Sequence, residues 1–269
     1  MVRAALLALV LTVITAAGAA SAQTAAVQLY AAGSLREALT DVVRNFEAES
    51  GQKVALTCGA SGLLRERIEK GEPAQVFASA DVDHPQRLAQ AGNWGAPRVF
   101  ARNLMCALAA PSVNASTDTL LETLLQPAVR VGTSTPKADP SGDYAWAVFR
   151  RADALRPGAF AALDAKALKL VGAADSAQPP AGRSTYAWNL EEGKADVFLV
   201  YCTNAAQAQR EVPRLQVIDV PAALQVAASY GLTVRSGAPP VAAQLADYLL
   251  APGAQAVLRS YGFGAPAAP

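Results

Sequence analysis

The feature that most constrains the fold is the alternation of short apolar runs with longer segments of helical periodicity. The runs VQLYA, VALTC and QVFAS each precede a helix-patterned segment, near 35–49, 63–70 and 83–91. Six more runs follow at NLMCALA, VRVGTS, ALKLV, DVFLVY, LQVIDV and GLTVR, with helical patterns at AWAVFRRAD, YAWNLEEGK, PVAAQLADYLL and GAQAVLRSYGF. This pattern predicts an α/β protein with mixed, mostly parallel sheets flanked by helices. The nine strand candidates are more than a single open sheet usually contains. We therefore expect two α/β lobes.

The amino-terminal segment MVRAALLALVLTVITAAGAASA combines one arginine, an apolar run and a small-residue end at Ala20-Ser21-Ala22. This composition predicts a cleaved secretory signal over residues 1–22, with an uncleaved anchor as the alternative. No other segment approaches the ~20 apolar residues that span a bilayer. We therefore expect a soluble, periplasmic protein.

The charge balance argues against a polyanionic partner. The chain has 23 Lys and Arg against 22 Asp and Glu, and loss of Arg3 with the signal would make the two numbers equal. Such a protein has no electrostatic reason to bind nucleic acid or an anionic membrane, so we expect neither partner. Separately, we expect the protein to be a monomer.

Histidine and cysteine usage restricts the chemistry further. His84 is the one histidine of the sequence; we expect it on the surface at a helix start, and a histidine-rich metal site is excluded. No G-x-S-x-G elbow occurs, which argues against a serine hydrolase. Cys58, Cys106 and Cys202 are too few for a disulfide scaffold. Three buried thiols are the simplest interpretation; if an exported protein oxidises a pair, we expect Cys106 with Cys202.

Four turns place small residues and a serine between an apolar run and a helical segment. They contain Ser34, Ser61, Ser141 and Ser184. Ser34 and Glu37 match the S-x-x-E capping box, so a plain helix cap is the alternative interpretation of the first turn. Helix starts present unpaired N–H groups and a partial positive charge, and in α/β sheets such turns gather at the carboxyl ends of strands. Together the turns predict a site for a small anion.

Five segments of the chain resemble a known family: LYAAGSLREAL, CGASGLLRERIEKGEPAQVFASAD, DPSGDYAWAVF, VFLVYCTNA and LADYLLAPGAQAVLRSYGF. In this order they are similar to the periplasmic molybdate-binding proteins of ABC importers, the ModA family. The resemblance implies a two-lobed periplasmic-binding-protein fold of type 2, the Venus flytrap. Lobe one would comprise 26–103 and 222–264, and lobe two 104–221. The segment TSTPKADPSGDYAW departs from the family's commoner sequence pattern and indicates a divergent branch.

The resemblance also implies a ligand, which is a tetrahedral oxyanion, molybdate or tungstate. It would be held by Ser34 and Ser61 through hydroxyl and N–H groups, by the Ser141 N–H and by the Tyr201 hydroxyl. None of these positions is a carboxylate, so they suit a fully ionised dianion. No direct metal ligand, no cofactor and no enzyme activity are implied, and the partner would be an ABC permease in the inner membrane.

The fifth position of the family pattern falls on Arg183 or, in a register one residue later, on Ser184. Arg183 is either a solvated loop arginine or a residue whose guanidinium donates two hydrogen bonds to two ligand oxygens. Asp139 and Asp143 flank the third turn, and we interpret them as residues that cap the following helix or interact with its dipole.

Alternatives to molybdate remain open. Sulfate or an organic acid, a sensory binding protein without a permease, and an exported enzyme that reuses the fold are the other candidates. Trp146, Trp188 and Tyr186 follow the third and fourth turns. We expect them to pack inside lobe two; if two of them lined the cleft, a carbohydrate or aromatic ligand would be favoured.

Overall fold

The computed structural model describes residues 25–266, so the predicted signal at 1–22 lies outside the described residues. All nine predicted runs form strands. The strands are β1 (Val27–Ala32), β2 (Val54–Gly59), β3 (Val76–Ser79), β4 (Arg98–Ala109), β5 (Val131–Ser134), β6 (Leu168–Val171), β7 (Val197–Tyr201), β8 (Gln216–Asp219) and β9 (Ala227–Val234).

The helices include every predicted segment and three that were not predicted. They are α1 (Arg36–Ser50), α2 (Ser61–Glu69), α3 (Asp83–Gln90), α4 (Leu120–Leu125), α5 (Pro140–Leu155), α6 (Ala159–Lys166), α7 (Thr185–Glu191), α8 (Cys202–Glu211), α9 (Pro240–Leu250) and α10 (Pro252–Ser260). The sequence patterns missed α4, α6 and α8. Two of these are short, and α8 begins directly after the last residue of β7, where no break separates strand from helix.

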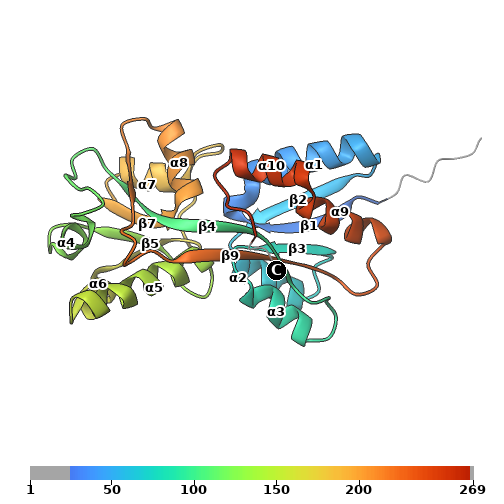
Figure 1. Cartoon of the computed structure of the whole chain (residues 1–269), viewed down its shortest axis with the longest axis horizontal. Helices are drawn as coiled ribbons and strands as arrows, with labels where there is room; N and C mark the ends of the chain where they lie inside the picture. Colours follow the sequence, from blue (N-terminus) through green and yellow to red (C-terminus); the bar gives the residue numbers. More distant parts are fainter. Residues whose placement is uncertain (1–24, 267–269) are drawn as a thin grey trace, which may run out of the picture.

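The sheet is mixed and curls through both parts of the molecule in the order β2-β1-β3-β9-β4-β7-β5-β6, with β8 paired to β4. The pairs β1–β2, β1–β3, β5–β6 and β5–β7 are parallel. The central pairs that involve β4 or β9 are antiparallel. Figure 1 shows the result: a half built on β1–β3 with α1–α3, α9 and α10, and a half built on β5–β8 with α4–α8. We call them the β1 half and the β7 half.

Two long strands connect the halves. The first part of β4, Arg98–Leu104, pairs with β9, and its last part, Met105–Ala109, pairs with β7. In Figure 1, β4 and β9 run side by side across the middle of the molecule. The predicted boundary at 103/104 lies one residue before the position in β4 where its partner changes from β9 to β7. We retain the lobes 26–103 plus 222–264 and 104–221 as a proposal.

Apolar faces explain how the helices cover the sheet. Helix α1 buries Ala38, Leu39, Val42, Val43 and Phe46, which recur at the three- and four-residue spacing of one helical face. The helix ends at Gly51 in the left-handed conformation (φ 70°), a position that favours glycine. These side chains join a buried cluster that extends along β1, β3, β4, β7 and β9 into both halves.

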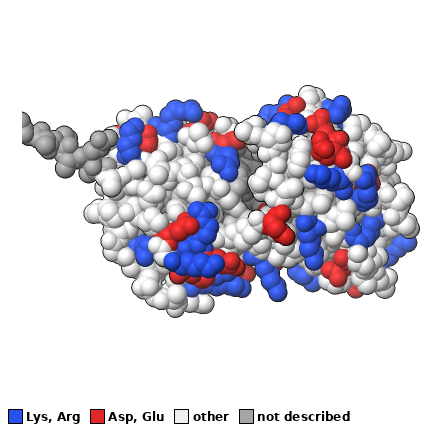
Figure 2. Space-filling model, turned by 180° about the vertical axis from the view of Figure 1, so that it is seen from behind, with Lys and Arg blue, Asp and Glu red and all other residues white. Residues whose placement is uncertain are grey.

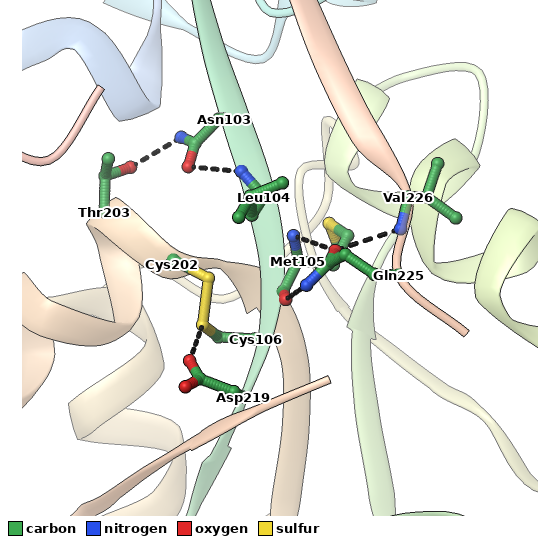
Figure 3. Close-up of a disulfide and its surroundings, with 9 residues drawn as sticks. All are labelled: Asn103, Leu104, Met105, Cys106, Cys202, Thr203, Asp219, Gln225 and Val226. Atoms are coloured by element: carbon green, nitrogen blue, oxygen red, sulfur yellow. Dashed lines mark hydrogen bonds between the residues drawn. A yellow bond between two sulfur atoms is a disulfide. The ribbon is translucent and has the colours of Figure 1, made fainter. Parts of the chain in front are cut away.

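The interpretation as three buried thiols is wrong, and the pair expected in the case of oxidation is the one that is bonded. Cys106 of β4 and Cys202, the first residue of α8, are bonded, and the bridge closes a sequence separation of 96 residues. Figure 3 shows the bridge beside the strand crossing, where Asn103 donates to Thr203 and the Gln225 side chain bonds the backbone of Met105. The third cysteine, Cys58, is a half-buried free thiol. The bridge thus ties the start of α8 to the strand that connects the two halves.

Charged side chains of both signs are interspersed on the face drawn in Figure 2, and a hollow separates the two halves there. No helix within residues 25–266 has the length and apolar character needed to cross a membrane.

Candidate functional site

A cleft of about 750 Å³ lies between the halves. Its walls are residues that follow the carboxyl ends of β1, β2 and β3 on one side and of β6 and β7 on the other. This is where α/β sheets hold their ligands. Of the predicted site residues, five line the cleft: Ser34, Ser61, Arg183, Ser184 and Tyr201. Ser141 is not among the lining residues, although its neighbour Asp139 is.

Ser34 does not cap a helix, so the capping-box interpretation is wrong. It lies in a single 3-10 turn, Gly33–Leu35, and α1 begins only at Arg36, with Leu35 at the N-cap and no side-chain cap. Its hydroxyl instead lies 2.9 Å from the Tyr230 hydroxyl of β9. The extra turn between strand and helix carries the serine away from the capping position and leaves it on the cleft wall.

Ser61 is the first residue of α2 and is buried, with 1% of its surface exposed. Its Oγ accepts a hydrogen bond from the Ala80 N–H (3.1 Å). The hydroxyl proton therefore stays available to a ligand, because a hydroxyl can donate one bond while it accepts others. The Ser61 N–H, at the start of the helix, has no partner within the helix either.

Tyr201 ends β7 and is buried, with 1% of its surface exposed. Its hydroxyl donates to the carbonyl of Ala80 in the β1 half over 3.4 Å. Burial raises the Tyr201 pKa well above its ordinary value, so the group is a neutral donor at any physiological pH. The same Ala80 thus contacts both Ser61 and Tyr201, which brings these two hydroxyls together from opposite halves.

The predicted donors of the β7 half are already engaged. The Ser141 N–H donates to Asp139 Oδ1 (3.1 Å), and the Ser184 N–H donates to Glu211 Oε2 (2.6 Å). The Arg183 guanidinium is paired with Glu191 and Glu211. Arg183 is therefore a partly exposed loop side chain, as one of the two interpretations expected, and its ion pairs leave its guanidinium occupied. Ser184 also caps α7, accepting from the Ala187 N–H (3.3 Å).

Tyr186 is the one of the three predicted aromatic residues that lines the cleft. Its hydroxyl lies 3.2 Å from Ser134 Oγ, and its ring packs on Phe198. Trp146 packs on Phe149 instead, as expected. The Lys194 ammonium group lies over the Trp188 ring, 3.6 Å from its centroid. With Tyr201, the cleft has two aromatic residues. Both rings pack against other rings of the protein, so they do not form the stacking platform of a carbohydrate site.

Asp139 is a cleft residue that sequence reasoning treated only as a cap. The cap is present, because its side chain accepts from the Ser141 N–H at the start of α5. The residue also belongs to the cleft lining. Burial raises its pKa to about 6, and the charges of Asp143 and Asp81 act in the same direction. The Ser141 N–H and the Ser134 hydroxyl oppose the shift.

Several contacts across the cleft hold the halves against each other. The Gly62 N–H of α2 donates to the Ala138 carbonyl (2.9 Å). At the other end, Glu37 of α1 accepts from Gln207 (2.7 Å) and Arg210 (3.0 Å) of α8. A Cβ at position 62 would lie 2.2 Å from the Lys137 carbonyl oxygen. The approach of the two halves therefore requires glycine there.

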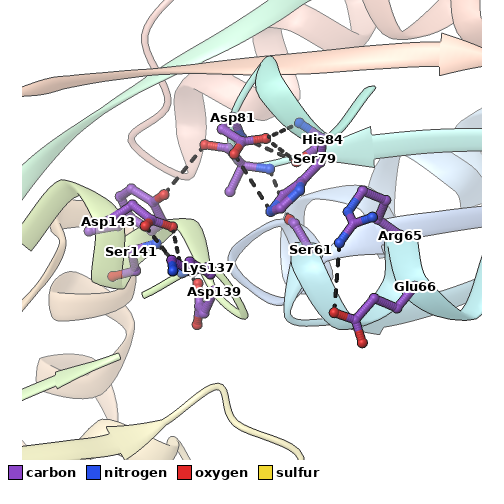
Figure 4. Close-up of polar contacts among 12 residues, drawn as sticks. Ser61, Arg65, Glu66, Ser79, Asp81, His84, Lys137, Asp139, Ser141 and Asp143 are labelled. Carbon is purple, nitrogen blue, oxygen red and sulfur yellow. Dashed lines mark hydrogen bonds and ion pairs between the residues drawn. The ribbon is translucent and has the colours of Figure 1, made fainter. Parts of the chain in front are cut away.

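His84 lies between the halves, so the expectation of a surface residue is wrong. Only 4% of it is exposed, because the first turn of α3 packs against β9 at Gly231, which has no side chain; Pro85 Cγ would lie 3.4 Å from a Cβ there. Figure 4 shows His84 and Asp81 facing Asp143 and the start of α5. Burial lowers the His84 pKa, against the charge of Asp81. The imidazole is therefore predominantly neutral at pH 7.

Within the described part of the chain, no group of three or more His, Cys, Asp or Glu side chains could hold a metal ion. The cleft is lined by serine and tyrosine residues, by helix starts, and by two acidic and two basic residues, Glu37, Asp139, Arg36 and Arg183. These groups can bind a solute by hydrogen bonds.

Comparisons with known sequences agree with this geometry. The family model for bacterial extracellular solute-binding proteins matches residues 27–264. An uncharacterised protein of Pasteurella multocida is 36% identical over 238 residues, which cover 88% of this chain and 97% of that protein. The molybdate-binding protein ModA of Azotobacter vinelandii is 34% identical over 74 residues, 28% of this chain and 29% of that protein.

Solved structures confirm the predicted periplasmic-binding-protein fold. The periplasmic molybdate-binding protein of Azotobacter vinelandii superposes with a TM-score of 0.70 at 20% identity, over 90% of this chain and 100% of that one. The sulfate-binding protein SubI of Mycobacterium tuberculosis gives 0.72 at 18% identity, over 88% and 86%. L-phospholactate-bound PEB3 of Campylobacter jejuni gives 0.70 at 15% identity, over 89% and 100%. At these identities the likeness concerns the fold alone. With the match over 27–264, the chain belongs to the bacterial extracellular solute-binding protein family.

Proposed function

We propose that this protein is the periplasmic solute-binding component of an ABC importer and captures an oxyanion in the cleft between its halves. The observation that carries the proposal is that Ser34, Ser61 and Tyr201, from both halves of the molecule, line one cleft. Solute-binding proteins of this family deliver their ligand to a membrane permease, which is the partner we propose. A sensory role without a permease is the alternative within the same family.

The β1 half supplies the donors for the oxyanion. Ser61 offers its hydroxyl proton and the N–H at the start of α2, where the helix dipole favours negative charge. Ser34 shares one bond with Tyr230 and keeps a second bonding direction. Both serines lie on turns whose backbone is fixed by β1 and β2. The donors therefore need little rearrangement when an anion enters.

Closure over the ligand completes the site. Tyr201 reaches across to Ala80, and Gly62 bonds Ala138, so the two halves already touch around the cleft. Opening at the β4 and β9 strands would release these contacts and admit solute, in the manner of a hinge. The closed form is the one that we propose the permease recognises.

Molybdate and tungstate are the simplest ligands of this kind and the first to test, because the resemblance to molybdate-binding proteins points to them. The two dianions are nearly alike in size, so little discrimination between them is expected. Sulfate, an inorganic anion of smaller radius, and organic oxyanions are the alternatives. A protonated oxyanion has an O–H to donate, and the Asp139 carboxylate on the cleft wall offers an acceptor for such a donor.

Isothermal titration of the mature protein with molybdate, tungstate, sulfate and phosphate tests the proposal. A hydrogen bond to a charged group contributes about 1.5–3 kcal/mol, so Ser34→Ala/Ser61→Ala should weaken binding by about a hundredfold or more. Ser112→Ala, at an exposed position outside the cleft lining, is the matched control and should leave the affinity unchanged. Thermal melts would verify that the double variant folds. Binding that survives the double substitution would contradict the proposal.

A further inference from the structure

The two walls of the cleft differ in the kind of hydrogen-bonding group they offer. On the β1 side, Ser34 and Ser61 present hydroxyl groups, and the one carboxylate among the described lining residues there, Glu37, is occupied by Gln207 and Arg210. On the β7 side, the donors expected for an oxyanion already have partners in the protein: the Ser141 N–H donates to Asp139 and the Ser184 N–H to Glu211, and the Tyr201 hydroxyl donates to the Ala80 carbonyl. An oxyanion on the β7 side would therefore find donors already taken, with carboxylates close by.

Asp139 is the acceptor of the β7 wall. Its Oδ1 accepts from the Ser141 N–H, and the residue is part of the cleft lining. A carboxylate accepts up to about four hydrogen bonds, so capacity remains beyond the contacts with Ser141 and Ser134. Gly172, at φ 85°, passes directly beside it: a Cβ there would lie 2.8 Å from Asp139 Oδ2. Any larger residue at position 172 would overlap the Asp139 side chain, so this close approach requires glycine.

A bare dianion matches only one of these walls. It has no proton to donate to Asp139, and an ionised carboxylate near it is repulsive. The cleft is also large for such a ligand. A tetrahedral oxyanion occupies roughly the space of two or three water molecules, ~60–90 Å³, whereas the cleft measures about 750 Å³. The remaining space is bounded by the small residues of the segment after β6, including Gly172 and Ala173.

We propose, on the basis of the proposed function, that the natural ligand is an organic oxyanion whose carbon skeleton carries hydroxyl groups. The oxyanion end binds Ser34 and Ser61 in the β1 half. A hydroxyl at the other end donates to Asp139 in the β7 half. Figure 4 shows Asp139, at the start of α5, across from Ser61 at the start of α2, as this arrangement requires. Closure of the halves brings the two ends of one molecule to complementary walls.

A pair of phosphate monoesters isolates the hydroxyl contribution. sn-Glycerol 3-phosphate and propyl phosphate share the phosphate, the ionic charge and the three-carbon chain, and only the first has hydroxyls. By titration calorimetry at pH 7.5, glycerol phosphate should bind at least about tenfold more tightly, because a hydrogen bond to a charged acceptor is a strong one. Asp139→Asn should reduce this ratio severalfold and should strengthen the binding of propyl phosphate by removing the repulsive charge.

The matched control is Asp143→Asn, four residues along the chain on the same helix. Asp143 bonds the Lys137 N–H and does not line the cleft, so the ratio should be unchanged. Equal binding of the two esters, or a ratio that Asp139→Asn leaves intact, would overturn the inference. Tight binding of molybdate with no binding of either ester would overturn it too, while leaving the proposed function standing. If neither the esters nor the inorganic anions bound, both would be refuted.

Discussion

Asp139→Asn should stabilise the ligand-free protein above pH 6 and have little effect near pH 4. The cause is the pKa of Asp139, raised by burial from 3.8 to about 6. Because the native state holds this proton more tightly than the unfolded chain, its stabilising contribution is present below pH 4. It is lost as the pH rises from about 4 to about 6. A shift of this size corresponds to at most about 3 kcal/mol.

Asparagine isolates this electrostatic effect. It caps helices about as well as aspartate, so the bond from the Ser141 N–H at the start of α5 is retained. Asparagine has no proton to lose between pH 4 and 6, so the variant lacks the loss that the wild type suffers. The free energy of unfolding of the variant minus that of the wild type should therefore increase by up to about 3 kcal/mol between pH 4 and pH 7.

The assay is urea denaturation of both proteins at closely spaced pH values from 4 to 8, without ligand. Other titrating groups contribute equally to both proteins and cancel in the difference. Asp118→Asn, at an exposed position outside the cleft, serves as the control. A difference between the Asp139 variant and the wild type that does not change with pH would refute the reasoning. So would a difference that becomes smaller as the pH rises.

Two further predictions concern how the halves are held together. Cys106→Ala/Cys202→Ala opens the 96-residue separation closed by the disulfide and should lower the free energy of unfolding by about 2–5 kcal/mol in urea denaturation; an unchanged urea midpoint would argue against this role. Gly62→Ala places a Cβ 2.2 Å from the Lys137 carbonyl oxygen, so the halves should separate, with a larger radius of gyration in solution scattering and weaker oxyanion binding. Gly253→Ala, where the Cβ meets open space, is its control, and equal radii for the two variants would contradict the prediction.

Local patterns in the sequence were enough to place the regular elements. All nine strands were predicted because apolar runs and their bounding turns are local features, as is the helical spacing in α1. Helices α4 and α6 were missed because they are short, and α8 because it follows β7 without a break. The disulfide was favoured among the possible pairs, but only the pairing of β4 with β7 brings Cys106 next to Cys202.

The site was predicted less completely, because contacts between distant segments decide which groups are free. Ser34 follows the S-x-x-E pattern of a cap, yet a tertiary partner, Tyr230, takes its hydroxyl. His84 follows the pattern of an exposed helix start, yet it is buried where the first turn of α3 packs near Gly231 of β9. Sequence spacing could identify both residues as notable, but it could not reveal what they contact.

The sequence by itself determined the α/β class, the order of the elements and the serine-bearing turns at the ends of the strands. Periodicity and turn chemistry act over a few residues and can be read from them directly. Only the tertiary structure decided that Asp139 stands on the cleft wall and that Glu211 occupies the Ser184 N–H. Hydrogen bonds and burial depend on which distant segments the curled sheet brings together, and this determines whether a polar group faces a ligand or the protein itself.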